Sequence, residues 1–124
     1  MKFFVAGSWN DRENVHKAIL LVREAGHKIS HDWTRLDAHS VADRVHISTL
    51  DFRGIAEADI VVFLATCPSS TGSYLVEFGI ALALGKPIWL IGNQMDNGLY
   101  AYHPAVRRAK NIEEIIAYYG VCRS

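Results

Sequence analysis

The sequence predicts a single α/β domain built on a doubly wound, five-stranded parallel sheet. Two apolar runs, residues 59–64 and 86–92, do not alternate between polar and apolar positions, which indicates strands that are buried on both faces. Segments with helical spacing alternate with such runs through short connections. Right-handed crossovers would then place helices on both faces of the sheet.

The first half of the chain predicts two strand-and-helix units. After the apolar run at residues 3–7, Asn10 or Asp11 can cap a helix that Gly26 ends. Residues 27–31 resume extended chain, and a polar stretch leads from there to a second helix. The apolar positions of this second helix include Val41, Val45, Leu50 and Ile55.

The second half continues the alternation. A glycine-rich turn opens an apolar helix at residues 72–85, residues 86–92 form the next strand, and a brief extended piece is expected near residues 105–109. Asn111 can cap a last helix, whose first turn carries two glutamates near its positive end. Five units in this order predict a flavodoxin-like or Rossmann-like sheet with strand order 2-1-3-4-5.

Composition bounds the size of the domain and the kind of partner. The 124 residues, half of them apolar, suffice for one domain that spans residues 1–124. Thirteen basic and thirteen acidic residues cancel, which argues against a nucleic-acid polymer or an anionic membrane as partner and favours a small molecule. The apolar runs are too short for a signal peptide or a membrane span, so a cytoplasmic location is expected.

We expect neither a metal nor a cofactor. His27 and His31 would share one face of an extended strand, but no spacing typical of a metal site accompanies the six histidines. Cys67 and Cys122 fit no ligand spacing and are expected to be reduced thiols. The loop before the 72–85 helix has neither a Walker pattern nor G-x-G-x-x-G, the usual signatures of nucleoside triphosphate and dinucleotide binding.

Glu77 is the strongest candidate for a catalytic group. It is an isolated carboxylate in an apolar helix, where an uncompensated charge is costly, so we expect it to face a cleft at the carboxyl edge of the sheet. A carboxylate there can attack a sugar carbon, with a second carboxyl group as acid or base. The candidates for that second group are Asp51, Asp32, Asp11 and Asp59. The competing interpretation of Glu77 is a solvated or salt-bridged helix residue.

The loop before this helix offers hydroxyl groups to a ligand. Thr71, Gly72 and Ser73 lie at a helix start, where unpaired amides and the helix dipole attract a phosphate or a sugar hydroxyl. An ordinary capped helix start is the alternative interpretation of the same residues.

The segment after the first strand offers aromatic and polar groups at the same edge. Trp9, together with Trp33 after the second strand, could stack on a nucleobase, although core packing is the commoner fate of tryptophan. Ser8 and Asn10 supply hydrogen-bond donors. Arg12 could pair with a phosphate or with a carboxylate at this edge, or could simply lie on the surface.

Three segments carry a family resemblance. They are VAGSWNDREN at residues 5–14, DFRGIAEADIVV at residues 51–62 and GSYLVEFGIALALGKP at residues 72–87. In this order they resemble the nucleoside 2-deoxyribosyltransferase family and the related nucleoside 5′-monophosphate N-glycosidases. The match covers most of the chain and implies a flavodoxin-like sheet.

The resemblance implies roles for individual residues. Glu77 would be the nucleophile at C1′ of the sugar, Asp51 would assist the leaving or entering base, and Trp9 would line the base pocket. The transferases usually have an aspartate where this chain has Thr71, whereas the monophosphate hydrolases have a hydroxyl residue that contacts the 5′-phosphate. The turn formed by Gly7 and Ser8 is similar to the phosphate-binding start of these hydrolases. The family also implies homo-oligomers, dimers or larger, in which a neighbouring subunit closes the pocket, here from residues 93–103.

Two functional hypotheses follow from the sequence. The first is an enzyme that cleaves or exchanges the N-glycosidic bond of a nucleoside or its 5′-monophosphate through a glycosyl ester on Glu77. The second is a non-catalytic nucleotide-binding or signalling module, because sheets of this type host many functions. The sequence leaves the base, the sugar and the need for a 5′-phosphate open.

Overall fold

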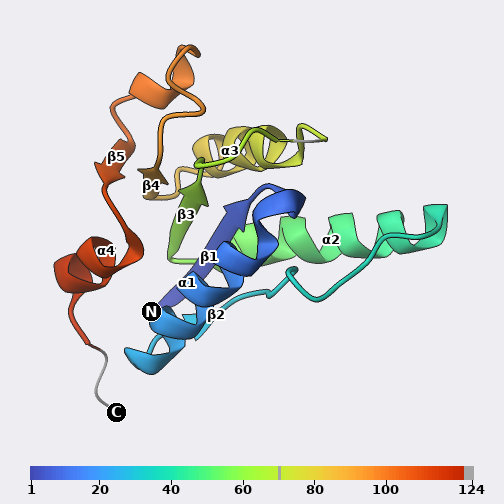
Figure 1. The fold of residues 1–124 in the computed structure, drawn as a ribbon, viewed down its shortest axis with the longest axis horizontal. Coiled ribbons are helices and arrows are strands. Elements are labelled where there is room, and N and C mark those ends of the chain that lie inside the picture. The colour runs from blue at the N-terminus through green and yellow to red at the C-terminus, as the bar shows by residue number, and fades with distance from the viewer. Residues whose placement is uncertain (70, 122–124) are drawn as a thin grey trace.

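The computed structural model describes residues 1–69 and 71–121 and contains a five-stranded parallel sheet of order β2-β1-β3-β4-β5 (Figure 1). The predicted fold class and strand order are confirmed. The strands are β1 (Lys2–Gly7), β2 (Lys28–Ile29), β3 (Ile60–Leu64), β4 (Ile88–Ile91) and β5 (Val106–Ala109). The helices are α1 (Arg12–Glu24), α2 (Val41–Glu57), α3 (Ser73–Ala83) and α4 (Ile112–Tyr119), with 3-10 turns at η1 (Trp9–Asp11) and η2 (Tyr100–Tyr102).

The helices form two layers around this sheet. Helix α1 packs beside α4 on one face, and α2 packs beside α3 on the other (Figure 1). Strands β3 and β4 are buried along their whole length, as their continuous apolar runs predict. Among the described residues, no helix is long and apolar enough to cross a membrane.

Two helix caps were predicted from the sequence, and the one at Asn111 is confirmed, whereas the capping box at the start of α2 was not predicted. Asn111 caps α4 by accepting a hydrogen bond from the backbone N–H of Glu114 at 3.0 Å, and Ser40 forms a capping box with Asp43 at the start of α2. The predicted cap of α1 is wrong in its chemistry. Asp11 occupies the N-cap position, but its carboxylate makes no capping bond because it accepts hydrogen bonds from Asn14 and Thr66 instead.

The second strand is shorter than predicted, and this separates the two histidines. Pairing with β1 covers only Lys28–Ile29, after which the Ser30 hydroxyl turns to the carbonyl of Gly54 in α2 at 2.7 Å. His27 is buried and donates from Nε2 to the carbonyl of Gly120 at 2.7 Å. His31 packs against α2, so the expectation that both rings share one strand face is wrong.

Candidate active site

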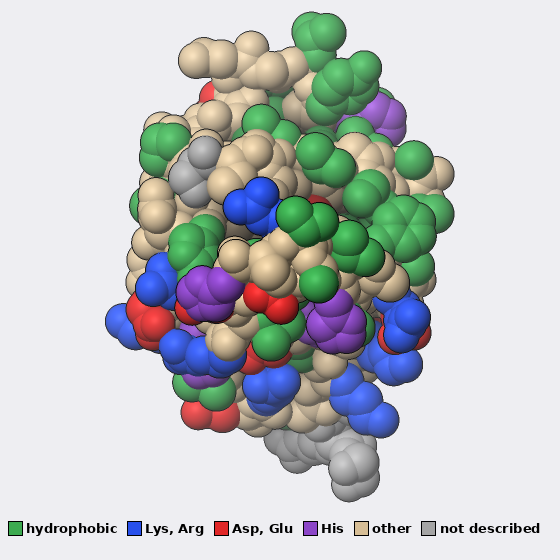
Figure 2. All heavy atoms as spheres, turned by 90° about the vertical axis from the view of Figure 1, so that its right-hand side faces the viewer, with side chains coloured by type: hydrophobic (Ala, Val, Ile, Leu, Met, Phe, Trp, Pro, Cys, Tyr) green, Lys and Arg blue, Asp and Glu red, His purple; other side chains and the backbone are tan. Residues whose placement is uncertain are grey.

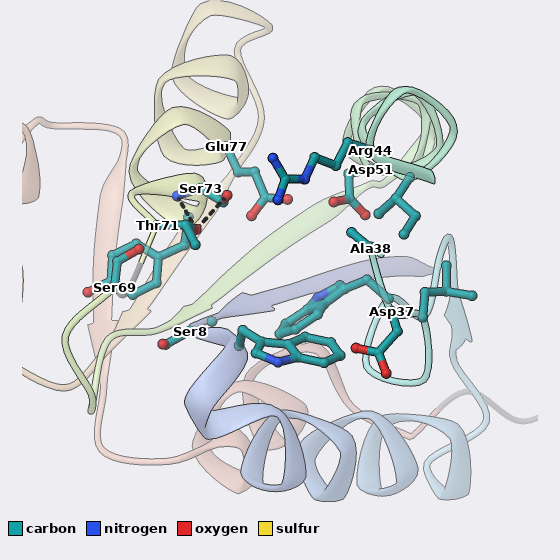
Figure 3. A pocket seen from close by; sticks show the side chains of 15 residues that line it. Ser8, Asp37, Ala38, Arg44, Asp51, Ser69, Thr71, Ser73 and Glu77 are labelled. Atoms are coloured by element: carbon teal, nitrogen blue, oxygen red, sulfur yellow. Dashed lines mark hydrogen bonds between the residues drawn. The ribbon is translucent and has the colours of Figure 1, made fainter. Parts of the chain in front are cut away.

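A cavity of about 510 Å³ opens at the carboxyl edge of the sheet, between α2 and α3. This volume lies within the range of pockets that bind small molecules. Eight of the residues predicted for the site line it (Figure 3). They are Gly7, Ser8, Trp9, Trp33, Asp51, Thr71, Ser73 and Glu77. Arg12 and Gly72 do not line it.

Glu77 and Asp51 face this cavity from opposite helices, α3 and α2 (Figure 3). Glu77 is half-buried, and desolvation together with the charge of Asp51 raises its pKa to about 8. Desolvation also raises the pKa of Asp51 to about 6. Because the two carboxyl groups interact, they titrate as a pair that keeps one proton near neutral pH.

The other three aspartates considered as partners of Glu77 have structural contacts. Asp11 binds Asn14 and Thr66, and Asp59 accepts a hydrogen bond from the backbone N–H of Lys2 at 2.8 Å, at the amino edge of the sheet. The third, Asp32, is described in the next paragraph. Of the four candidates, Asp51 alone lines the cavity with Glu77.

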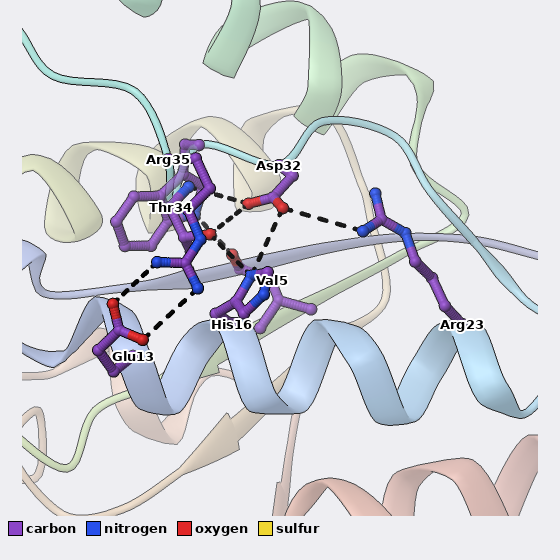
Figure 4. Close-up of polar contacts among 8 residues, drawn as sticks. Val5, Glu13, His16, Arg23, Asp32, Thr34 and Arg35 are labelled. Atoms are coloured by element: carbon purple, nitrogen blue, oxygen red, sulfur yellow. Dashed lines mark hydrogen bonds and ion pairs between the residues drawn. The ribbon is translucent and has the colours of Figure 1, made fainter.

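Asp32 instead fixes the segment that follows β2 (Figure 4). It accepts hydrogen bonds from the backbone N–H and the hydroxyl of Thr34 at 2.9 and 2.5 Å, and it lies 3.7 Å from His16 and 3.9 Å from Arg23. Burial raises the pKa of Asp32, but these contacts outweigh burial and hold the pKa below its usual value. Next to it, Trp33 donates from Nε1 to the carbonyl of Val5 at 2.7 Å.

His31 was missed as a site residue by sequence reasoning. Its Nε2 lies 3.4 Å from Oδ1 of Asp51, and both atoms are buried without a well-aligned hydrogen-bond partner among the described residues. Desolvation lowers the pKa of His31, although the nearby charge of Asp32 opposes this. His31 can lie this close to α2 because residue 54 is a glycine. A Cβ atom on Gly54 would lie 2.8 Å from the Cβ of His31.

The hydroxyl loop is folded on itself at the start of α3. The Thr71 and Ser73 hydroxyls lie 2.8 Å apart, and Thr71 also accepts from the backbone N–H of Ser73 at 3.3 Å. Gly72 has a φ of +79°, which favours glycine, and donates from its N–H to Ser69 Oγ at 2.8 Å. Gly72 thus sets the backbone conformation of the loop without lining the cavity, whereas the exposed hydroxyls of Thr71 and Ser73 line it.

Trp9 and Trp33 also line the cavity. Trp33 is buried and its ring centroid lies 6.4 Å from that of Trp9. The Arg12 guanidinium stacks over the Trp9 ring, with Cζ 4.4 Å from the ring centroid, and donates a hydrogen bond to the Trp9 carbonyl at 3.1 Å. Arg12 therefore supports Trp9 rather than projecting into the cavity.

Comparisons with known proteins bear on the fold. No protein-family model matches the chain, and no curated protein matches it. Among solved structures, the chain is similar to the 2-deoxyribosyltransferase of the psychrotolerant bacterium Bacillus psychrosaccharolyticus, with a TM-score of 0.75 and 17% identity over 100% of this chain and 99% of that chain. It is also similar to the CMP N-glycosidase BcmB of Clostridium botulinum, with a TM-score of 0.63 and 21% identity over 96% of this chain and 98% of that chain.

The chain has their fold. Both solved structures are enzymes of the kinds that the three sequence segments resemble. Each likeness extends over nearly the whole of both chains.

Sequence reasoning also missed the outer wall of the cavity. Residues 36–38 and two side chains of α2, Arg44 and Ile47, contribute to it. A helical spacing of three and seven residues places Ile47 and Asp51 on the same face as Arg44, so this signal was present in the sequence.

Cys67 is a half-buried free thiol, whereas Cys122 lies outside the described residues.

Proposed function

We propose that this protein cleaves or exchanges the N-glycosidic bond of a nucleoside or a nucleoside 5′-monophosphate. The observation that carries the proposal is the pair of dehydrated carboxyl groups, Glu77 and Asp51, that face one cavity with a tryptophan wall. The fold shared with a 2-deoxyribosyltransferase and a CMP N-glycosidase supports it.

The proposed reaction proceeds through a covalent ester. In the form of the pair that carries its one proton on Asp51, the ionised Glu77 attacks C1′, the C1′–N bond breaks with its electron pair going to the base nitrogen, and Asp51 gives its proton to the base. Water or a second base, deprotonated by Asp51, then attacks C1′ and releases the carboxylate. Water as acceptor makes the protein a hydrolase, and a base makes it a transferase.

His31 contributes to this reaction by holding Asp51. A neutral imidazole 3.4 Å from Oδ1 can donate a hydrogen bond to that oxygen both in the ionised carboxylate and in the acid that carries its proton on Oδ2. Asp51 would thus keep one orientation in both steps of the reaction. Its other oxygen stays available to the base.

The sugar and its 5′ substituent would bind at the start of α3. Thr71 and Ser73 supply hydroxyls there, at the positive end of the helix dipole of α3. Ser8, in the turn after β1, lines the same cavity. These groups suit a 5′-phosphate or a 5′-hydroxyl.

A panel assay tests the proposed function. The purified protein is incubated with ribo- and deoxyribonucleosides and their 5′-monophosphates, with and without added bases, and free base is measured. Release of sugar or sugar phosphate identifies a hydrolase, and exchange only with added base identifies a transferase. The competing function, a nucleotide-binding module, predicts ligand-induced thermal stabilisation without product after long incubation. That result would contradict our proposal.

We also propose that copies of this chain associate. A second cavity of about 780 Å³ is lined by apolar residues of α3 and by the segment after β4, including the exposed Leu75 and Tyr100. Figure 2 shows hydrophobic side chains gathered on the upper part of one face, above a band of charged side chains and histidines. Light scattering coupled to size exclusion would reveal a dimer or larger oligomer, and a monomer at micromolar concentration would contradict association.

A further inference from the structure

Arg44 is the one basic side chain, Lys or Arg, that lines the active-site cavity among the described residues. It lies one turn into α2, and its side chain extends over the cavity (Figure 3). The other charged groups lining this cavity are the carboxyl groups of Asp37, Asp51 and Glu77. A single guanidinium therefore faces an otherwise acidic or neutral space.

This guanidinium has no protein partner in the described part of the chain. Arg44 is an exposed residue, and unlike the exposed Arg35 and Arg108, which lie 2.9 and 2.6 Å from carboxylate oxygens, it makes no ion pair and no side-chain hydrogen bond with a described residue. Figure 3 shows it directed toward Glu77 across the cavity. The N–H donors of Arg44 thus remain available to a reactant that fills the space between Arg44 and Glu77.

The arrangement of the helices indicates which part of the reactant this is. Thr71 and Ser73 come from the start of α3 and lie on the opposite side of Glu77 from Arg44 (Figure 3). If the 5′ end of the sugar binds at these hydroxyls, C1′ lies at Glu77 and the base lies toward α2. Asp51, the proposed proton donor to the base, also projects from α2.

We propose that Arg44 donates a hydrogen bond to the acceptor atom beside the glycosidic nitrogen of the leaving base, a pyrimidine O2 or a purine N3. This inference rests on the proposed function. When the C1′–N bond breaks, its electron pair passes to the base, and negative charge spreads onto that acceptor atom. Arg44 stabilises this charge and keeps its own proton, because a guanidinium does not deprotonate in proteins, while Asp51 supplies the proton that the base takes up.

Two pyridone nucleosides test this assignment. In the 2-pyridone nucleoside the carbonyl lies beside the glycosidic nitrogen, and in the 4-pyridone nucleoside it lies opposite, on the same ring. We expect Arg44→Met to lower kcat/KM by about 100-fold for the 2-pyridone nucleoside and for uridine or deoxyuridine, in the range seen when one oxyanion donor is removed. For the 4-pyridone nucleoside the loss should stay below about threefold, because no acceptor atom faces the guanidinium.

Matched variants control for charge and for folding. Arg44→Lys keeps the charge and one donor, so it should retain part of the activity on the 2-pyridone nucleoside. Arg53 is an exposed arginine on the same helix that does not line the cavity, so Arg53→Met should behave as the unaltered protein on every substrate. Circular dichroism of each variant checks that the total helix content is unchanged.

Three outcomes would overturn the inference. An equal loss for both pyridones would assign Arg44 a structural role, and a loss seen only with 5′-monophosphates would assign it to the phosphate. Equal kinetics of Arg44→Met and Arg53→Met would remove Arg44 from the reaction. If the unaltered protein releases no base from any nucleoside or nucleotide, the proposed function itself fails.

Discussion

Charged side chains at the two edges of the parallel sheet are in opposite situations. At the amino edge, Lys86 donates from Nζ to the carbonyls of Ala56 and Ala58 at 2.7 and 2.9 Å, and Asp59 accepts from the backbone N–H of Lys2. At the carboxyl edge, Asp51 and His31 each present a buried polar atom without a well-aligned partner. The amino edge is arranged for stability, while the carboxyl edge holds dehydrated groups that a ligand can satisfy.

This difference has a consequence for pH. The pKa of Glu77 lies above its usual value, so the folded protein binds a proton more tightly than the unfolded chain does between pH 4.5 and about 8. Stability contributed by this site therefore falls as the pH rises through that window. The carboxyl edge destabilises the fold most under the conditions in which its carboxylates are ionised.

The largest expected effect comes from removing the proposed nucleophile. Glu77→Gln should lower kcat by more than about 10³-fold, because no carboxylate remains to form the ester, while nucleotide binding persists. The variant should also gain thermal stability relative to the unaltered protein, and the gain should be larger at pH 9 than at pH 5. Turnover at the original rate, measured by base release, would refute the role of Glu77.

Removing the proposed acid should have the next largest effect. Asp51→Asn should lower kcat by about 10²- to 10⁴-fold for ordinary nucleosides, because the base must then leave without a proton. A p-nitrophenyl glycoside, which needs no protonation, should lose much less, and an equal loss on both substrates would contradict proton donation.

The pH dependence of the rate tests whether the carboxyl groups of Glu77 and Asp51, at the carboxyl edge of the sheet, control turnover. Turnover requires one proton on the carboxyl pair, so kcat/KM should peak between about pH 6 and about pH 8. In Asp51→Asn the alkaline fall should disappear, and the rate should follow a single titration, that of Glu77. An unchanged bell-shaped profile would place the titrating groups elsewhere.

His31 should have a smaller effect. We expect His31→Phe to lower kcat about tenfold, the worth of one hydrogen bond to a charged group, and to shift the alkaline fall of the rate upward because the ionised Asp51 loses a donor. His31→Gln keeps a donor and should restore part of the rate. A purely structural role would leave the pH profile unmoved.

The smallest expected effect lies at the amino edge. Lys86→Met should lower the free energy of unfolding by about 1 kcal/mol through the loss of two hydrogen bonds, with kcat unchanged. Denaturant titration and the base-release assay measure the two quantities. A loss of activity without a loss of stability would contradict the separation of the two edges.

The elements that could be predicted are those with strong local signals. The buried strands β3 and β4 and the apolar helix α3 follow from hydrophobic runs and flanking glycines, and Glu77 stands out because such a helix rarely carries one carboxylate. Strand β2 was predicted too long, because its end depends on the hydrogen bond from Ser30 to Gly54, which lies in another element. Residue-level roles at the site remain predictions that the proposed experiments test.

The sequence by itself determined the sheet order and one charged residue that faces the cavity, because periodicity and isolated charges act over a few residues. The residues alone left four aspartates open and the resemblance implied Asp51, and the tertiary structure shows Asp51 lining the cavity with Glu77, with Arg44 on the same cavity wall and His31 3.4 Å from Asp51. Those choices depend on how α2 packs across the sheet edge. Proximity between distant segments, and the dehydration that shifts their pKa values, has no counterpart in local sequence.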